Sequence, residues 1–321
     1  MNDSNKSSVL ITGANGFIGN RLLLSLINQG VNAVGAVRDL NVSTPNFIQS
    51  PSLSVDADWR ELLVNKDVVI HLAGRAHVLK ETIDNPLALF REVNVDGTIK
   101  LAQQAIQAGV KRFVFISSIG VNGNSTTTTP FSAEDEPNPV EPYALSKYEA
   151  EQALRKLSFE SGMELVIIRP PLVYGADAPG NFGKLINLVC KGYPLPLGAV
   201  NNKRSFVSVN NLISLITTCI NHPNAANQLF LVSDDEDIST TDLLSRVNKI
   251  LKIRSRLVPV PVFLLYLIAQ IVGKKDVINK LCCSLQVNIG KTKSLLDWVP
   301  SESVEQGLCQ IVRGFSNEKT I

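Results

Sequence analysis

The sequence predicts an α/β fold, in which a doubly wound parallel sheet carries a smaller C-terminal lobe. Strand-like and helix-like runs alternate through the first half of the chain. Several strand-like runs are near-continuous in apolar residues, which is typical of parallel strands that are covered on both faces. A turn punctuated by glycines joins the first strand to the first helix. Such alternation predicts a parallel sheet with right-handed crossovers.

The expected elements follow from hydrophobic periodicity and from turn residues. Strands are expected at Val9–Thr12, Ala33–Val37, Val68–Leu72, Phe113–Ser117 and Leu165–Arg169. Helices are expected at Phe17–Gln29, Val93–Ala108 and Tyr143–Ser161, because apolar residues recur there at helical spacing. Gly30 follows the first of these helices as a C-terminal cap would.

The pattern becomes less regular after Gly175, where Pro and Gly residues cluster at 179–180 and 193–198. We therefore predict two units. Residues 1–175 are expected to form the sheet domain. Residues 176–321 are expected to form mainly a smaller lobe, interleaved with the last elements of the sheet.

Composition gives no electrostatic case for nucleic-acid binding. The 321 residues carry 31 basic and 29 acidic side chains, for a net charge of +2, whereas binding along a phosphate backbone needs clustered cations. The five cysteines match no zinc pattern, so we predict reduced thiols and no metal site. Met1–Ser8 lacks the apolar stretch of an export signal, and a cytoplasmic location is expected.

One later segment, Val258–Gly273, is very apolar and is followed by Lys274 and Lys275. Its uninterrupted part after Pro261 has twelve residues. That length falls short of the ~20 residues needed to span a bilayer, so we predict no transmembrane span. A buried helix is expected here, with docking on a membrane surface as the alternative.

The first turn, TGANGFIG at residues 12–19, predicts a dinucleotide site and a sheet of the Rossmann type. Gly13 would allow the tight turn, Gly16 would let the backbone approach a pyrophosphate, and Gly19 would let the helix pack closely on the sheet. The pyrophosphate would lie at the helix N-terminus, beside Phe17 and Ile18, where free N–H groups and the macrodipole favour anions.

The end of the second strand bears on the choice of cofactor. An acidic residue there would bind the ribose 2′-hydroxyl of NAD, but this chain has Val37 followed by Arg38, with Asp39 one residue further. The Arg38 guanidinium could pair with a 2′-phosphate, so NADP(H) is preferred and NAD(H) remains possible. The alternative is a surface arginine paired with Asp39.

Tyr143 and Lys147 are four residues apart, which places a phenol and an ammonium on one face of a helix, one turn apart. A tyrosine with a pKa near ~10 is a poor acid or base at neutral pH. The Lys147 ammonium, together with the positive nicotinamide of an oxidised cofactor, is expected to lower the pKa of Tyr143 towards the working range. The pair opens the helix that follows a buried strand ending at Ser117 and Ser118.

Six motifs together resemble the extended short-chain dehydrogenases, a family of NAD(P)-dependent nucleotide-sugar epimerases, dehydratases and reductases. In the family's order, over nearly the whole chain, they are TGANGFIG (12–19), HLAG (71–74), NVDGT (94–98), FISS (115–118), YALSK (143–147) and RPPLVYG (169–175). The chain departs from the pattern at Asn122, where the family has the Tyr of VYG. No clear Gly-Asp adenine motif precedes Trp59.

The resemblance implies roles for individual residues. Ser118 would hydrogen-bond the reacting sugar oxygen, with Ser117 as its rival for that role. Tyr143 would move the proton, and Lys147 would also hold the nicotinamide ribose. Further cofactor contacts are implied for Leu72, Ala73, Gly74, Asn94, Ser117 and Pro170.

The residues after Ser118 narrow the reaction. Relatives that dehydrate the sugar carry an acidic pair there, and relatives that epimerise C3 and C5 carry a cysteine. Ile119 and Gly120 cannot carry a proton. Reduction of a 4-keto sugar, as in the formation of UDP-N-acetylquinovosamine, is slightly preferred. The alternative is 4-epimerisation of UDP-glucose or UDP-N-acetylglucosamine, and a more remote one is a non-catalytic cofactor sensor.

The resemblance also implies a UDP-sugar substrate. Asn181 resembles the family's diphosphate-binding asparagine, and Leu195 and Leu197 resemble the strand that flanks the uracil. Arg204 matches the arginine that clamps the diphosphate, a task that suits a bidentate guanidinium. A solvated surface cation beside Lys203 is the alternative for Arg204. The family further implies a homodimer formed through a two-helix face.

Overall fold

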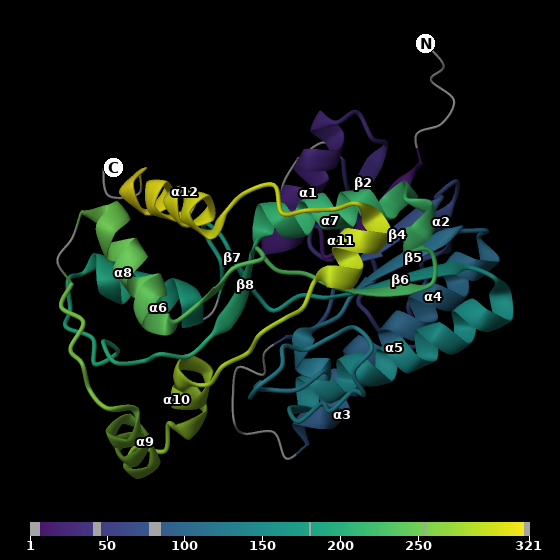
Figure 1. Cartoon of the computed structure of the whole chain (residues 1–321). Helices are drawn as coiled ribbons and strands as arrows, with labels where there is room; N and C mark the ends of the chain where they lie inside the picture. The colour runs from purple at the N-terminus through teal and green to yellow at the C-terminus, as the bar shows by residue number, and fades with distance from the viewer. Residues whose placement is uncertain (1–6, 41–45, 77–84, 180, 253–254, 318–321) are drawn as a thin grey trace.

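The computed structural model describes residues 7–40, 46–76, 85–179, 181–252 and 255–317 (Figure 1), and for residues 181 and 312–317 it describes the backbone only. Seven strands form the main sheet in the order β3-β2-β1-β4-β5-β6-β9. They are β1 (Val9–Thr12), β2 (Ala33–Val37), β3 (Phe47–Gln49), β4 (Val68–His71), β5 (Arg112–Ile116), β6 (Glu164–Arg169) and β9 (Gln228–Leu231).

All neighbouring strands of this sheet run parallel. Strand order proceeds outward from β1 on one side and from β4 on the other, so the order reverses between these two strands. Ligands of doubly wound sheets bind at this reversal, beyond the carboxyl ends of the strands. The predicted doubly wound parallel sheet is therefore confirmed, and it locates the candidate site after β1 and β4.

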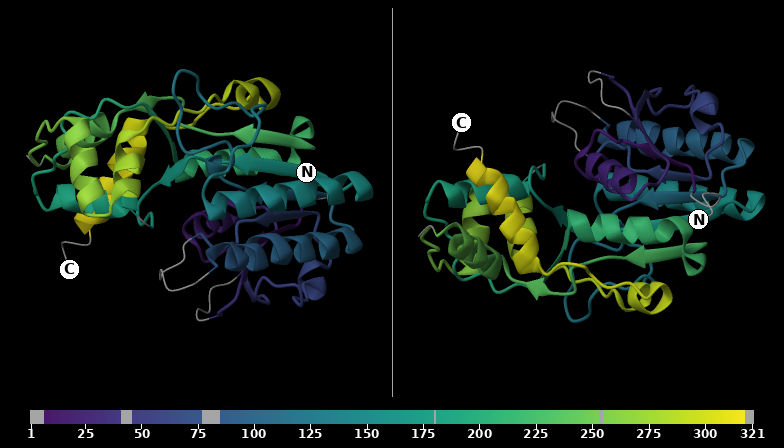
Figure 2. Two further views of the ribbon diagram at one scale, coloured as in Figure 1. Left: turned by 90° about the horizontal axis from the view of Figure 1, so that it is seen from below. Right: turned by 90° about the horizontal axis from the view of Figure 1, so that it is seen from above.

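Helices cover both faces of the main sheet (Figures 1 and 2). On one face α1 (Phe17–Asn28) packs against α7 (Val209–Asn221), with α11 (Gly290–Leu296) beside β9. On the other face α4 (Gly97–Gln107) packs against α5 (Pro142–Ser161), and the short helices α2 (Arg60–Leu63) and α3 (Pro86–Arg91) adjoin them. The strands are thus covered on both sides, as their apolar runs require.

The predicted elements are present; the first two strands have the predicted bounds, and the other elements have shifted ends. The strands expected at 68–72 and 113–117 each end one residue earlier than predicted. The helix expected at 93–108 belongs to a longer run that begins at Pro86, where the Asn85 side chain accepts a hydrogen bond from the Ala88 N–H at 3.1 Å. A π-helical turn, Glu92–Asp96, joins α3 to α4.

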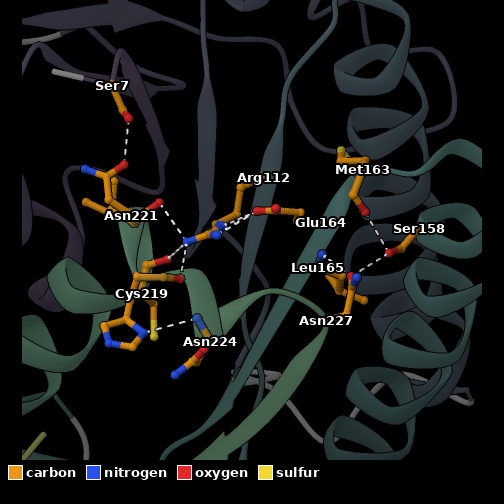
Figure 3. Close-up of polar contacts among 12 residues, drawn as sticks. Ser7, Arg112, Ser158, Met163, Glu164, Leu165, Cys219, Asn221, Asn224 and Asn227 are labelled. Carbon is orange, nitrogen blue, oxygen red and sulfur yellow. Dashed lines mark hydrogen bonds and ion pairs between the residues drawn. The ribbon is translucent and has the colours of Figure 1, made fainter. Parts of the chain in front are cut away.

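Buried polar contacts fasten later parts of the chain to the sheet (Figure 3). The Arg112 guanidinium in β5 is bonded to the Glu164 carboxylate at 2.7 Å and donates to the carbonyls that end α7, among them Cys219 at 2.7 Å. The Asn227 side chain, just before β9, accepts hydrogen bonds from the Leu165 N–H at 3.0 Å and from the Ser158 hydroxyl at 3.3 Å. These contacts fix β9 beside β6.

A smaller lobe has its own sheet and its own hydrophobic core. The sheet joins β7 (Leu172–Tyr174), β8 (Arg204–Ser208) and β10 (Asp237–Ile238), and the helices of the lobe are α6 (Asn181–Cys190), α8 (Thr240–Leu251), α9 (Val262–Ile271), α10 (Lys275–Cys282) and α12 (Val304–Asn317). Its core includes Phe182, Ile186, Leu244 and Leu308. Because α7 and β9 come from the second half and complete the main sheet, the division at residue 175 stays a prediction.

The apolar segment at 258–273 forms a helix, but the prediction that this helix is buried is wrong. Within α9 only Leu265 and Ala269 are buried. The helix packs against α10 and the edge of the smaller core along one narrow side, and no described element covers its other side. None of the helices in the described ranges is long and apolar enough to cross a membrane.

Candidate active site

The glycines of the first turn allow an approach of backbone to backbone that a side chain would prevent. Gly13 has the left-handed φ of +67°, and a Cβ added there would lie 2.8 Å from the Ala73 nitrogen. A Cβ on Gly19 would collide with the Gly13 carbonyl oxygen and lie 2.8 Å from the Ala14 Cα. Gly19 therefore lets the first turn of α1 pack against the backbone of Gly13 and Ala14. The sequence predicts instead that Gly19 lets the helix pack on the sheet.

The N-terminus of α1 fits an anionic group. Gly16 is the N-cap residue and has no side chain that could satisfy the first N–H groups of the helix, which belong to Phe17, Ile18 and Gly19. The Gly16 N–H itself donates to the Gly13 carbonyl at 3.0 Å, which tightens the turn. With the positive end of the helix dipole at the same place, this glycine cradle fits the pyrophosphate of a dinucleotide.

A buried histidine fixes the segment that follows β4 against this turn. Thr12 Oγ1 lies 2.7 Å from His71 Nδ1, and His71 Nε2 lies 2.9 Å from Thr98 Oγ1. The Ala73 N–H donates to Thr12 Oγ1 at 3.2 Å. Burial lowers the pKa of His71 to about 3, so the ring is neutral and serves as a structural link. Leu72 and Ala73 are half-buried here, and Gly74 is exposed.

Asn94 links the same segment to the helix that carries Tyr143. Its Oδ1 accepts a hydrogen bond from the Arg75 N–H at 2.8 Å, and its Nδ2 donates to the Ser146 hydroxyl at 3.0 Å. A Cβ on Gly74 would lie 3.1 Å from Asn94 Oδ1 and 3.5 Å from Lys147 Nζ. Asn94 thus aligns Gly74 with Lys147, and a direct contact of Asn94 with cofactor stays a prediction.

Lys147 is a buried cation that forms no ion pair with a carboxylate of the described residues. Its Nζ donates to the Ile116 carbonyl at 2.9 Å and lies 4.5 Å from the centre of the Phe115 ring. Burial lowers the pKa of Lys147 to about 8. The ammonium therefore stands at the carboxyl end of β5, beside Gly74.

Tyr143 lies one turn before Lys147 on α5, half-buried, with its ring edge-on to Phe90 at 5.9 Å between centroids. Burial raises the pKa of Tyr143 to about 12. In the chain by itself this rise follows from desolvation of the phenolate. The expectation that Lys147 and the positive nicotinamide together lower the pKa of Tyr143 stays a prediction.

The two candidate serines have different environments. The Ser117 hydroxyl donates to the buried Glu151 carboxylate at 2.5 Å. Ser118 caps the short helical turn Ile119–Val121, its Oγ accepting from the Gly120 N–H at 3.2 Å. A Cβ on Gly120 would lie 3.2 Å from the Ala144 Cβ, so this turn packs on the first turn of α5, next to Tyr143. The geometry favours Ser118 over Ser117 for contact with a substrate.

The sequence analysis missed a buried ion pair behind the site. Arg169 Nη2 lies 2.5 Å from Glu151 Oε2, and Arg169 Nη1 donates to Asn122 Oδ1 at 2.9 Å. The Asn122 Nδ2 donates in turn to the Ser132 carbonyl at 2.9 Å, which gives this departure from the family pattern a structural role. The available signal was the position of Glu151, four residues after Lys147 and hence on the same helix face.

The remaining cofactor candidates lie at the carboxyl edge of the sheet. Arg38 is exposed one residue after β2. Pro170 is buried directly after β6, and its carbonyl accepts a hydrogen bond from the Ile119 N–H at 3.0 Å. Neither position tests the predicted contacts, which stay predictions.

Arg204, in β8, is a largely enclosed cation in the smaller lobe. Its Nη1 donates to the Cys283 carbonyl at 3.0 Å, and no carboxylate within the described ranges forms an ion pair with it. Burial lowers the pKa of Arg204. A guanidinium bonded to a neutral carbonyl retains donors that could bind an anion.

Backbone pairing connects the strand of Arg204, through one intervening segment, to the loop that follows Ser118. The Ser205 N–H donates to the Leu285 carbonyl at 2.9 Å, and the Phe131 N–H donates to the Gln286 carbonyl at 2.8 Å. Residues 285–286 therefore lie between β8 and that loop.

The remaining candidates for substrate binding are two leucines and one asparagine of the smaller lobe. Leu195 and Leu197 are buried in the smaller core, where the Leu195 N–H donates to the Arg256 carbonyl at 2.9 Å. Their side chains pack in this core, and their contact with a uracil ring stays a prediction. Asn181 begins α6, and its side chain lies outside the described residues.

The sequence profile of the NAD dependent epimerase/dehydratase family matches residues 9–232. The chain belongs to this family. A UDP-glucose 4-epimerase of Vibrio cholerae is 45% identical over 312 residues, which cover 96% of this chain and 95% of the relative. The N-acetyl-alpha-D-glucosaminyl-diphospho-ditrans,octacis-undecaprenol 4-epimerase of Escherichia coli O157:H7 is 28% identical over 334 residues, covering 96% of this chain and 94% of that protein.

Solved structures share the fold of this family member. A UDP-glucose 4-epimerase of Thermotoga maritima, solved with UDP-glucose, superposes with a TM-score of 0.78 at 22% identity, covering 97% of this chain and 99% of that one. A UDP-glucuronic acid 4-epimerase of Bacillus cereus, solved with NAD, gives a TM-score of 0.78 at 21% identity with the same coverage. The family predicted from the motifs is confirmed. Both relatives in sequence are named 4-epimerases, which agrees better with the epimerase alternative than with the 4-ketoreductase that we preferred.

Proposed function

We propose that the chain is an NAD(P)-dependent UDP-sugar 4-epimerase. The observation that carries the proposal is the arrangement of Tyr143 and Lys147 on one face of α5, with Lys147 reaching the end of β5 and Gly74, close to the glycine turn. The similarity to the Vibrio cholerae UDP-glucose 4-epimerase over nearly the whole chain supports epimerisation ahead of 4-ketoreduction.

The chain's own residues would move one proton at the sugar O4. A bound nicotinamide dinucleotide supplies the hydride acceptor and donor at C4, together with a positive charge near the phenol. Tyr143 would take the O4 proton as the carbonyl forms and return it as the carbinol forms again. Ser118 would donate a hydrogen bond to the same oxygen. Ile119 and Gly120 cannot take a proton from a neighbouring carbon, so the reaction is confined to C4.

The glycine cradle would hold the pyrophosphate of the cofactor, and Lys147 would reach its nicotinamide ribose. The preference for NADP(H) stays a prediction that depends on Arg38. It is tested by comparing dissociation constants for NADPH and NADH in the wild type and in Arg38→Ala. Loss of a charged hydrogen-bond partner should weaken NADPH binding by about 1.5–3 kcal/mol with little effect on NADH. Unchanged NADPH affinity in Arg38→Ala, or a wild-type preference for NADH, would make Arg38 a surface charge only, and equal losses for both cofactors would exclude a contact with the 2′-phosphate.

Product analysis tests the proposed reaction. The purified chain is incubated with NAD(P)⁺ and UDP-glucose or UDP-N-acetylglucosamine, without reductant, and separately with NADPH and a UDP-4-keto-6-deoxy sugar. Formation of the C4 epimer without net cofactor consumption supports the proposal. Stoichiometric NADPH consumption with the keto sugar, and no epimer from the first substrates, would identify a reductase instead. Binding without turnover would identify a cofactor sensor. The homodimer and the cytoplasmic location also stay predictions.

A further inference from the structure

Helix α9 presents a continuous apolar surface to the solvent. Five side chains of this ten-residue helix are exposed and apolar, with exposed fractions of 38–86%: Phe263, Leu264, Leu267, Ile268 and Ile271. At about 100° per residue they occupy one arc of about 140°. Leu265 and Ala269 lie on the opposite side and pack inward. The arc is therefore one face of the helix and not a set of scattered positions.

The patch extends beyond α9. Val272 directly follows α9, and Val277 lies on α10, which packs against α9; both are exposed. With Val258, four residues before α9, and the arc, they make eight of the nineteen large exposed apolar side chains in the described chain. Proteins normally expose such residues singly, and a contiguous patch marks an interaction surface. Figure 1 shows α9 at the outer end of the smaller lobe, beyond α10 and away from the main sheet.

Cations border this patch. The segment from Lys249 to Lys280 contains seven basic residues and one acidic residue, Asp276, in a chain whose net charge is only +2. Lys274 and Lys275 are exposed directly after α9, and neither forms an ion pair with another described residue. An apolar helix face bordered by lysines complements the interface of an anionic bilayer. Against a second copy of the same patch, the lysines would face one another and repel.

We propose that α9, with the lysines that follow it, docks on an anionic phospholipid surface. Ten residues are too few to span a bilayer, so the helix would lie in the interface with its apolar arc towards the acyl chains and Lys274 and Lys275 at the lipid phosphates. From α10 the chain leads to Cys283, whose carbonyl accepts the hydrogen bond from Arg204. Docking would thus hold the smaller lobe, and Arg204 within it, at the membrane. This surface is separate from Tyr143 and Lys147, so the inference stands independently of the proposed reaction.

Co-sedimentation of the full chain with vesicles tests the docking. The wild type should bind vesicles that contain phosphatidylglycerol more tightly than vesicles of phosphatidylcholine, and added salt should weaken that binding. Leu267→Gln/Ile271→Gln removes apolar contact without adding charge and should lower the partition coefficient more than about tenfold. Lys274→Glu/Lys275→Glu should also lower it more than about tenfold for phosphatidylglycerol.

The matched control is Leu24→Gln/Val299→Gln, which replaces exposed apolar side chains on α1 and in a C-terminal loop and should bind as the wild type does. Thermal unfolding followed by circular dichroism should give the same midpoint for all variants. The proposal is overturned by wild-type binding that is absent or equal for both lipids, or by wild-type affinity in either the Gln or the Glu variant. It is also overturned if, without lipid, light scattering shows that Leu267→Gln/Ile271→Gln dissociates an oligomer, since the arc would then join two copies of the chain.

Discussion

Lys147 and Glu151, one turn apart on α5, are buried yet have different partners. The Lys147 ammonium bonds to the Ile116 carbonyl, whereas the Glu151 carboxylate pairs with Arg169 and accepts from Ser117. Within the described ranges the ammonium therefore pairs with no carboxylate, and it remains available beside Gly74. Such an arrangement suits a cation that must act on bound groups.

Tyr143→Phe removes the proton-transfer group and preserves the ring that packs against Phe90. We expect 4-epimerase turnover to fall by roughly 10²–10⁴, with the affinities for UDP and cofactor little changed. Steady-state rates and calorimetric titration measure these quantities. Tyr148→Phe, on the same helix, is the matched control and should keep wild-type turnover. Turnover near the wild-type value in Tyr143→Phe would contradict the role of Tyr143.

His71 should make the fold sensitive to acid. The unfolded chain takes up a proton at His71 near its ordinary pKa of 6.5, whereas burial lowers the pKa in the folded chain to about 3. Between these values the unfolded state binds more protons, so stability falls as the pH falls through 6.5. At about pH 5.5 the loss should be about 1.3 kcal/mol relative to neutral pH.

Urea unfolding at neutral pH and at about pH 5.5 checks the His71 prediction in the wild type and in His71→Asn. The variant should lack the part of the pH dependence that His71 causes. The same loss of stability in both proteins would mean that His71 does not stay neutral in the fold.

At the scale of elements, an irregular helix and a buried ion pair position the site. The π-helical turn Glu92–Asp96 carries Asn94, which bonds both to Arg75 and to Ser146 on α5. Single π-helical turns within α-helices frequently occur at functional sites. One turn after Lys147 on α5, Glu151 bonds to Arg169 at the end of β6. The helix is thus fixed at two points, which orients Tyr143 and Lys147 relative to the sheet.

The Glu151–Arg169 pair should matter most when only one partner is removed. Glu151→Leu leaves the Arg169 guanidinium buried without its carboxylate, and we expect a loss of about 3–5 kcal/mol in the free energy of unfolding. Glu151→Leu/Arg169→Met removes both charges and should lose less than the single variant. Denaturant titration of both variants measures the difference. If the double variant were the less stable of the two, the prediction would be wrong and the ion pair itself would contribute net stability.

At the scale of the whole molecule, the two lobes contribute different groups. The lobe built on the main sheet contains the glycine turn, and its helix α5 carries Tyr143 and Lys147. The smaller lobe contains Arg204. The segment at residues 283–289 joins the two, since it pairs with β8 on one side and with the loop after Ser118 on the other. A substrate could therefore contact both lobes at once.

Arg204→Ala should weaken UDP binding by about 1.5–3 kcal/mol, the range for a hydrogen bond to a charged group. A diphosphate is remote from the reacting carbon, so its contact should be similar in the ground state and the transition state. KM should then rise while kcat changes little. Calorimetric titration of UDP measures the affinity, with Lys203→Ala, an exposed neighbour, as the control. Unchanged UDP affinity in Arg204→Ala would refute the clamp.

The sequence by itself determined the local conformations and their order. Apolar runs and alternation predicted the parallel sheet, and the glycine turn and the spacing of Tyr143 and Lys147 predicted which side chains share a face. These features depend on residues within one turn or one strand, so periodicity can report them. The order of the motifs likewise predicted the family, and the match of the family profile to residues 9–232 confirms it.

The tertiary structure decided what each face meets. The pairing of Ser117 with Glu151 and the pairing of Glu151 with Arg169 join segments that are 34 and 18 residues apart. The rise in the pKa of Tyr143 depends on the burial of its phenol, and the exposure of α9 depends on the lack of a covering layer among the described elements. A hydrophobic helix has the same sequence pattern whether its second face is covered by protein or open to solvent, because the pattern fixes the helix and distant segments fix its surroundings.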